Sequence, residues 1–151
     1  MNKEFVMRGQ TDSGETEVLN FSGYKPGYAY RLVEFGVYPT NWDSTGGGAQ
    51  AECVGSITAG KTAAPPIDVN FNDEGLIGNA YFWQYYGASA LPGAGGIVND
   101  TFLITQNLIL MVQDNQSSPQ PVNWQCRFVA EKMSGPEEAV ANYKQFTISD
   151  E

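Results

Sequence analysis

The chain has 151 residues, of which 42% are hydrophobic and 13% aromatic, and it contains 17 glycines. Its 8 Lys and Arg against 17 Asp and Glu give a net charge of −9 without a basic cluster, which argues against nucleic acid as a partner. Histidine is absent, which excludes Ser-His-Asp triads, Cys-His pairs and imidazole metal ligands.

A chain of this length is expected to form one domain over residues 1–151, and its composition favours strands joined by turns. The first ten residues, MNKEFVMRGQ, lack the apolar run of a secretory signal. No stretch has the ~18 apolar residues of a membrane span. We therefore expect a protein without a membrane span that stays in the compartment where it is made.

The first half of the chain predicts four strands separated by Gly, Pro and Asp turn residues, at 4–8, 16–21, 28–39 and 49–58. The third strand is apolar on both faces, one formed by Ala29, Val33, Phe35 and Val37 and the other by Tyr28, Tyr30, Leu32 and Tyr38. The fourth strand alternates cleanly and places Cys53 toward the core.

The second half predicts a short strand at 67–71, a turn at 72–75 and a long strand from 76 to about 86. Residues 87–96, GASALPGAGG, are expected to form a loop, and residues 100–105, DTFLIT, another strand.

Residues 107–131 predict a hairpin. Its first arm, NLILMVQ, is apolar on both faces, and its second arm, VNWQCRFVAE, carries Val122, Trp124, Cys126, Phe128 and Ala130 on one face. The connection DNQSSPQP is expected to form an exposed tip. We interpret the hairpin first as architecture and not as a reactive site.

A helix is predicted after Ser134, which is a suitable N-cap, with Pro136 in the first turn and Glu137 at the capping-box position. A last strand is expected around residues 145–149. The whole pattern predicts an all-β fold: an antiparallel β-sandwich, jelly-roll-like, with one short C-terminal helix. Because several strands lack a polar face, we expect neighbouring copies to cover them in a symmetric homo-oligomer.

Two patterns bear on metal and thiol chemistry. Asp68, Asn70 and Asn72 alternate as in a calcium loop, but the expected Gly and bidentate Glu are missing, so a hydrogen-bonded turn is favoured. Cys53 and Cys126 form no zinc pattern and are expected to be buried free thiols. We expect no catalytic residue, no metal site and no cofactor.

Aromatic residues form the candidate site for recognition. Tyr81, Trp83 and Tyr85 share one face of a strand, which suits a core or subunit interface and also a stacking platform for sugar rings. Trp42, close to the three glycines 46–48, suggests a recognition loop. A sandwich core or a subunit interface is the favoured interpretation of the strand, because no set of polar anchors is adjacent.

The chain resembles small structural proteins encoded beside head genes in marine bacteriophages. The segments that carry the resemblance are GYKPGYAYRLVEF, GSITAGKTAAPP, NFNDEGLIGNAYFWQ, VNDTFLITQNLILMVQDN and VNWQCRFVAEKMSGPEEAVANYKQF. The resemblance implies a β-sandwich virion component that assembles in the bacterial cytoplasm as many symmetric copies, without a cofactor or a catalytic residue.

These expectations combine into a non-enzymatic bacteriophage structural protein. Its role would be capsid decoration, a minor capsid component or a small shell-forming jelly roll, with itself and other capsid proteins as partners. The alternative is a carbohydrate- or receptor-binding β-sandwich module that uses Trp83, Tyr85 and Trp42. An enzyme that works through carboxylates is the third and least favoured hypothesis.

Overall fold

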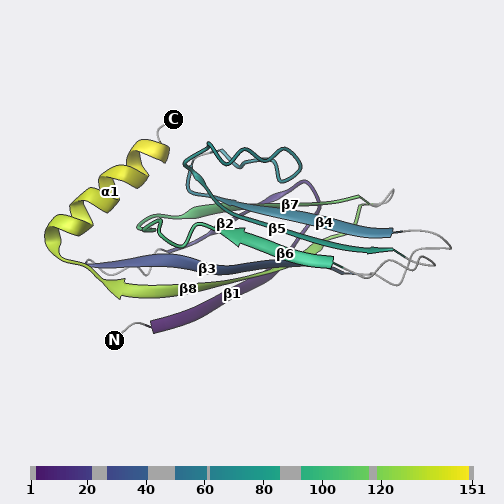
Figure 1. The fold of residues 1–151 in the computed structure, drawn as a ribbon, viewed down its shortest axis with the longest axis horizontal. Coiled ribbons are helices and arrows are strands. Elements are labelled where there is room, and N and C mark those ends of the chain that lie inside the picture. The colour runs from purple at the N-terminus through teal and green to yellow at the C-terminus, as the bar shows by residue number, and fades with distance from the viewer. Residues whose placement is uncertain are drawn as a thin grey trace.

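The computed structural model describes residues 3–21, 27–40, 50–60, 62–85, 93–115 and 119–149. Within these ranges lie eight strands and one helix (Figure 1). They are β1 (Lys3–Thr11), β2 (Thr16–Leu19), β3 (Tyr28–Pro39), β4 (Gln50–Thr58), β5 (Leu76–Tyr85), β6 (Gly93–Val98), β7 (Leu108–Asp114), β8 (Val122–Lys132) and α1 (Gly135–Ser149).

The strands form two antiparallel sheets, ordered β1-β8-β3 and β2-β7-β4-β5-β6. In Figure 1 the three-stranded sheet lies below the five-stranded one, and α1 stands at one end. The predicted antiparallel β-sandwich with a C-terminal helix is confirmed. Within the part of the chain that is described, no helix is both long and apolar enough to cross a membrane.

The pairing is jelly-roll-like. In a jelly roll, a folded ribbon of eight strands pairs the first strand with the eighth, the second with the seventh, the third with the sixth and the fourth with the fifth. Here β1 pairs with β8, β2 with β7 and β4 with β5. The sixth strand departs from this order, because β6 pairs with β5. It still lies against β3, since a Cβ added at Gly96 would overlap the carbonyl oxygen of Phe35.

The core lies between the two sheets and contains both arms of the segment predicted as a hairpin. The inward faces of β7 and β8 are buried, formed by Leu108, Leu110, Val112, Val122, Trp124, Cys126 and Phe128. The faces were predicted correctly, but the hairpin is wrong, because β7 and β8 belong to different sheets. The two apolar faces meet across the core. The exposed tip predicted between the two arms includes residues 116–118, which lie outside the described residues.

The predicted assignment of side chains to the two faces of β3 is wrong, because the strand contains a β-bulge. The register with β8 shifts between Leu32 and Glu34. An extra residue in one strand reverses the alternation beyond it, and Leu32 therefore shares the inward face with Phe35 and Val37. Ala29 points to the opposite face, where it is buried against Met133 and other residues near α1.

Four predicted elements need correction. Residues 67–71 form an irregular segment with turns at its two ends and not a strand, and residues 93–96, expected in a loop, open β6. Residues 100–105 contribute only one isolated bridge, from Ile104 to Tyr30. The last strand at 145–149 is absent because α1 continues to Ser149. The N-cap was predicted correctly: Ser134 Oγ accepts a hydrogen bond from the Glu137 N–H at 3.4 Å.

Candidate interaction surfaces

The outer side of the five-stranded sheet carries a long excursion between β4 and β5, seen above the sheet in Figure 1. Two hydroxyls of β4 attach it to the sheet. Ser56 Oγ donates to the Ala64 carbonyl, and Thr58 Oγ1 accepts from the Ala64 N–H at 3.2 Å. Both hydroxyl residues are buried. The excursion therefore covers part of the outward face of β4.

Residues 62–75 of this excursion, here called the apolar loop, present three apolar side chains to solvent. The exposed fractions are 68% for Ile67, 39% for Val69 and 65% for Phe71. Large apolar side chains grouped at a surface are characteristic of interaction sites. Sequence reasoning missed this surface because residues 67–71 predicted a short strand and not an exposed loop.

Hydrogen bonds within the apolar loop fix its conformation. Asn70 Oδ1 accepts from the Asn72 N–H at 3.0 Å, and Asp73 Oδ1 accepts from the Gly75 N–H at 2.9 Å. The Asp68 N–H also donates to the Pro65 carbonyl at 3.2 Å. These bonds confirm the hydrogen-bonded turn that we favoured over a calcium loop. Part of the apolar surface continues onto the sheet, because Phe71 and Ile97 line one groove of about 370 Å³.

Tyr81 and Trp83 form the described part of the predicted aromatic platform. On β5 they face outward, while Phe82 between them packs against the core. The side chain of Tyr85 and the whole of Trp42 lie outside the described residues. The structure therefore supports two of the four predicted residues as neighbours on one face.

Two glycines of β6 allow the platform to lie close to the sheet. Trp83 is paired with Gly93 and Tyr81 with Gly95. A Cβ at Gly93 would overlap the indole of Trp83, and a Cβ at Gly95 would lie 2.7 Å from the Tyr81 hydroxyl. The aromatic side chains therefore extend across the neighbouring strand. The signal that could have revealed this was the spacing of the two glycines, which matches that of the two aromatics.

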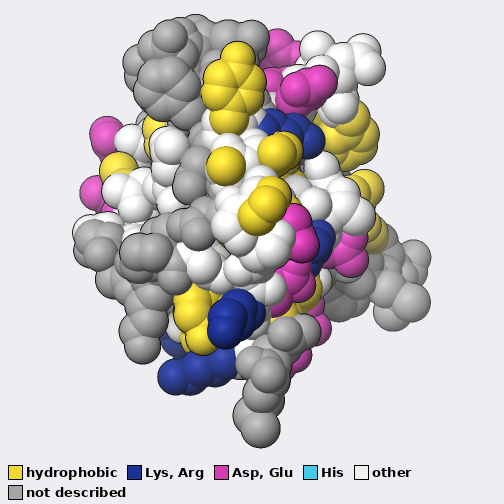
Figure 2. Space-filling model, turned by 90° about the vertical axis from the view of Figure 1, so that its left-hand side faces the viewer, with side chains coloured by type: hydrophobic (Ala, Val, Ile, Leu, Met, Phe, Trp, Pro, Cys, Tyr) yellow, Lys and Arg dark blue, Asp and Glu magenta, His cyan; other side chains and the backbone are white. Residues whose placement is uncertain are grey.

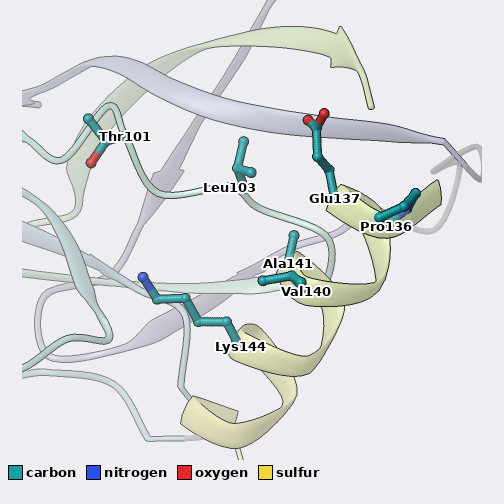
Figure 3. A pocket seen from close by; sticks show the side chains of 7 residues that line it. All are labelled: Thr101, Leu103, Pro136, Glu137, Val140, Ala141 and Lys144. Atoms are coloured by element: carbon teal, nitrogen blue, oxygen red, sulfur yellow. The ribbon is translucent and has the colours of Figure 1, made fainter. Parts of the chain in front are cut away.

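The C-terminal helix borders a cavity of about 390 Å³ (Figure 3). Its lining residues, all labelled in the figure, are Thr101, Leu103, Pro136, Glu137, Val140, Ala141 and Lys144. Val140 is 69% exposed, whereas Ala141 is buried. Figure 2 shows this end of the molecule, where hydrophobic side chains are scattered among polar and acidic ones.

The outward face of the three-stranded sheet carries ion pairs. Arg127 lies between Glu34 at 3.3 Å and Glu4 at 3.6 Å, and Arg31 contacts Glu131 at 2.8 Å. These side chains are partly or largely exposed, so each pair contributes roughly 0–1 kcal/mol. These ion pairs determine how charge is distributed over this face, and they contribute little to the stability of the fold.

Neither cysteine is poised for chemistry at neutral pH. Cys53 and Cys126 are buried free thiols, as predicted. Burial raises the pKa of each thiol to about 12, and the charge of Asp114 adds to the effect at Cys53. Among the residues described, no group of three or more His, Cys, Asp or Glu side chains is arranged to hold a metal ion.

No protein family model matches the chain, and no curated protein sequence matches it. Among solved structures, the chain is similar to one from the three-dimensional structure of Cocksfoot mottle virus, with a TM-score of 0.40 and 7% sequence identity. The similarity covers 92% of this chain and 100% of that chain. A likeness of this size carries no argument about function, and the β-sandwich is established by the strand pairing itself.

Proposed function

We propose that the protein is a non-enzymatic structural component of a bacteriophage particle that acts by self-association. In this role it decorates the capsid, serves as a minor capsid component or forms a small shell, and it assembles in the host cytoplasm. The jelly-roll-like pairing supports the proposal by analogy, since viral capsid domains use this architecture. The bacteriophage part of the proposal comes from the resemblance described for the sequence, which no family model or curated sequence supports.

The observation that carries the proposal is the apolar loop. Three apolar side chains project from a segment whose backbone is already fixed by hydrogen bonds at Asn70 and Asp73. A preorganised loop loses little conformational entropy on association, and burying its side chains gives roughly 25 cal/mol per Å². The loop is therefore suited to hold a protein partner, and a second copy is the simplest one for a shell protein.

Mass measurements over a wide concentration range test this proposal. We expect species larger than the 16.4 kDa chain, and we expect Phe71→Asp to shift them toward the monomer. Tyr143→Asp is the matched control, because it adds the same charge at a similarly exposed aromatic position on α1, outside the cavity lining. A mass of 16.4 kDa at every concentration would contradict self-association.

The aromatic platform supports a second candidate function, a carbohydrate- or receptor-binding module. Lectin domains also use jelly rolls, and Trp83 and Tyr81 extend over Gly93 and Gly95. Flat aromatic faces stack well on the apolar faces of sugar rings. Binding to a glycan array that is lost in Trp83→Ala and retained in Tyr143→Ala, an exposed aromatic on α1, would favour this candidate.

A further inference from the structure

We propose that the free edge of β1 pairs with β1 of a second copy, antiparallel, about a two-fold axis at Val6. Within the described part of the chain, β1 is the outermost strand of its sheet and its only ladder is with β8. Figure 1 shows β1 at the lower margin of the molecule. An edge strand of nine residues presents unpaired backbone N–H and C=O groups that another strand can satisfy.

The side chains of this edge are incompletely covered on both faces. On the outward face Val6 is 42% exposed. On the inward face Phe5 and Met7 pack against the core but are only partly buried. A strand added beside β1 would cover all three side chains, whereas a solitary edge leaves them partly in water.

The charges of β1 select the partner and the register. Glu4 and Arg8 both lie on the outward face, two positions to either side of Val6. An antiparallel pair centred on Val6 places Glu4 of each copy opposite Arg8 of the other. Charged residues commonly protect edges from pairing, but here the two signs are spaced so that a two-fold arrangement forms two opposite-charge pairs.

Other two-fold registers lack this complementarity. Outward residues meet outward residues only when the axis passes through a residue of the strand. An axis at Glu4 or at Arg8 places like charges opposite each other. An axis at Phe5 or at Met7 places one of the charged side chains opposite Val6. The register centred on Val6 is thus the one that the edge itself favours.

This inference rests on the proposed self-association and assigns one interface to it. Arg8→Glu tests it most cleanly, because it places two acidic side chains opposite each other at both ends of the pair. We expect the dissociation constant of the dimer to rise about tenfold, from two lost attractions and two new repulsions. Glu4→Arg should weaken the dimer similarly, although it also removes the contact of Glu4 with Arg127.

The double variant Glu4→Arg/Arg8→Glu distinguishes this interface from a general effect of net charge. It exchanges the charges and restores both opposite-charge pairs, so we expect its dissociation constant to return toward that of the native protein. Within one chain the two positions are roughly 13 Å apart along the strand. Direct interaction inside the monomer therefore cannot produce such a rescue. Urea denaturation of each variant checks that the monomer remains folded.

The outcomes distinguish this inference from the broader proposal. If native protein associates and Phe71→Asp weakens the association, but neither charge reversal changes it, the β1 interface is wrong while self-association stands. Weakening by both reversals without rescue in the double variant also overturns the register. If the native protein is monomeric at every concentration, both proposals fail.

Oxidative cross-linking gives a second test that does not depend on charge. Val6→Cys places two thiols at the two-fold axis, where directly opposite Cα atoms lie within the range of a disulfide. The native thiols are buried and do not compete. We expect a covalent dimer from Val6→Cys and none from Val18→Cys, an exposed position on the edge strand of the other sheet. Equal cross-linking of both variants would contradict the interface.

Discussion

Gln145 of α1 and Thr105 of the segment before β7 are joined by two hydrogen bonds in a buried environment. Gln145 Oε1 accepts from the Thr105 N–H at 2.6 Å and from the Thr105 hydroxyl at 3.2 Å. The same oxygen accepts from the Gln106 N–H at 2.9 Å, and Gln145 Nε2 donates to the Gln106 carbonyl at 3.3 Å. One side chain thus satisfies the backbone of an irregular segment and fixes the helix to the sandwich.

We expect Gln145→Ala to release α1 while the sheets remain folded. The substitution leaves buried backbone groups of residues 105 and 106 without their partner, which costs about 1–3 kcal/mol. Hydrogen exchange should show lost protection over 135–149 and retained protection in β7 and β8. Val140→Ala, at an exposed position of the same helix, is the control and should change neither. Loss of protection throughout the chain would instead show that the helix is required for the whole fold.

Trp124→Ala should destabilise the protein by about 3–5 kcal/mol. The Trp124 side chain is buried between the sheets, and its indole N–H donates to Thr11 Oγ1 at 2.9 Å. Trp124→Phe keeps most of the apolar volume and removes the hydrogen bond, so it should cost less. Urea unfolding of both variants measures the two effects, and equal losses would contradict this division between packing and hydrogen bonding.

Trp83→Ala should have a smaller effect on the free energy of unfolding than Trp124→Ala. Trp83 faces outward on β5 and extends over Gly93 on β6, so its removal uncovers one edge strand without opening the core. Urea unfolding measures the stability, and mass measurement of the folded variant reports whether the same surface contributes to assembly. A loss as large as that of Trp124→Ala would show that the platform is a structural contact.

The two thiols should make stability depend on alkaline pH. Burial raises each folded-state pKa from the ordinary value of 9.0 to about 12, so the unfolded chain releases these protons first. Stability from the buried neutral thiols is complete below pH 9 and is lost as the pH rises toward 12. Denaturation from pH 8 to about 11 should therefore show a steeper decline for native protein than for Cys53→Ala/Cys126→Ala, which shares its other titrating groups.

The sequence correctly indicated which face of a strand is buried, but it did not indicate which strands pair with each other. Alternation along β8 and along β4 correctly placed Trp124 and Cys53 in the core, because burial on one face imposes a period of two. The same alternation contains no information about which strand lies alongside, and an arch between sheets leaves the same pattern as a hairpin. The bulge after Leu32 likewise has no local signal, since it depends on pairing with β8.

Local secondary-structure preference gave a wrong prediction for two segments, residues 93–96 and residues 145–149. Residues 93–96 are too glycine-rich to favour a strand, but the aromatics of β5 cover the glycines and the pairing with β5 holds them extended. Residues 145–149 include β-branched side chains that favour a strand, yet the helix continues through them, with Gln145 anchored at Thr105. For the candidate surfaces, the sequence indicated Tyr81 and Trp83 but not the apolar loop, whose conformation depends on hydrogen bonds at Asn70 and Asp73.

The pairing of β1 with β8 affects the order in which the strands can fold. Lys3 lies opposite Ala130, so β1 cannot pair with β8 until the residues between them have been synthesised. β3 also waits for β8, whereas β4, β5 and β6 follow one another along the chain and pair as neighbours. Contacts between such distant residues close large loops and slow folding. Until β8 is available, β1 therefore remains without its partner strand, and the apolar side chains of Phe5 and Met7 lack the contacts that β8 provides.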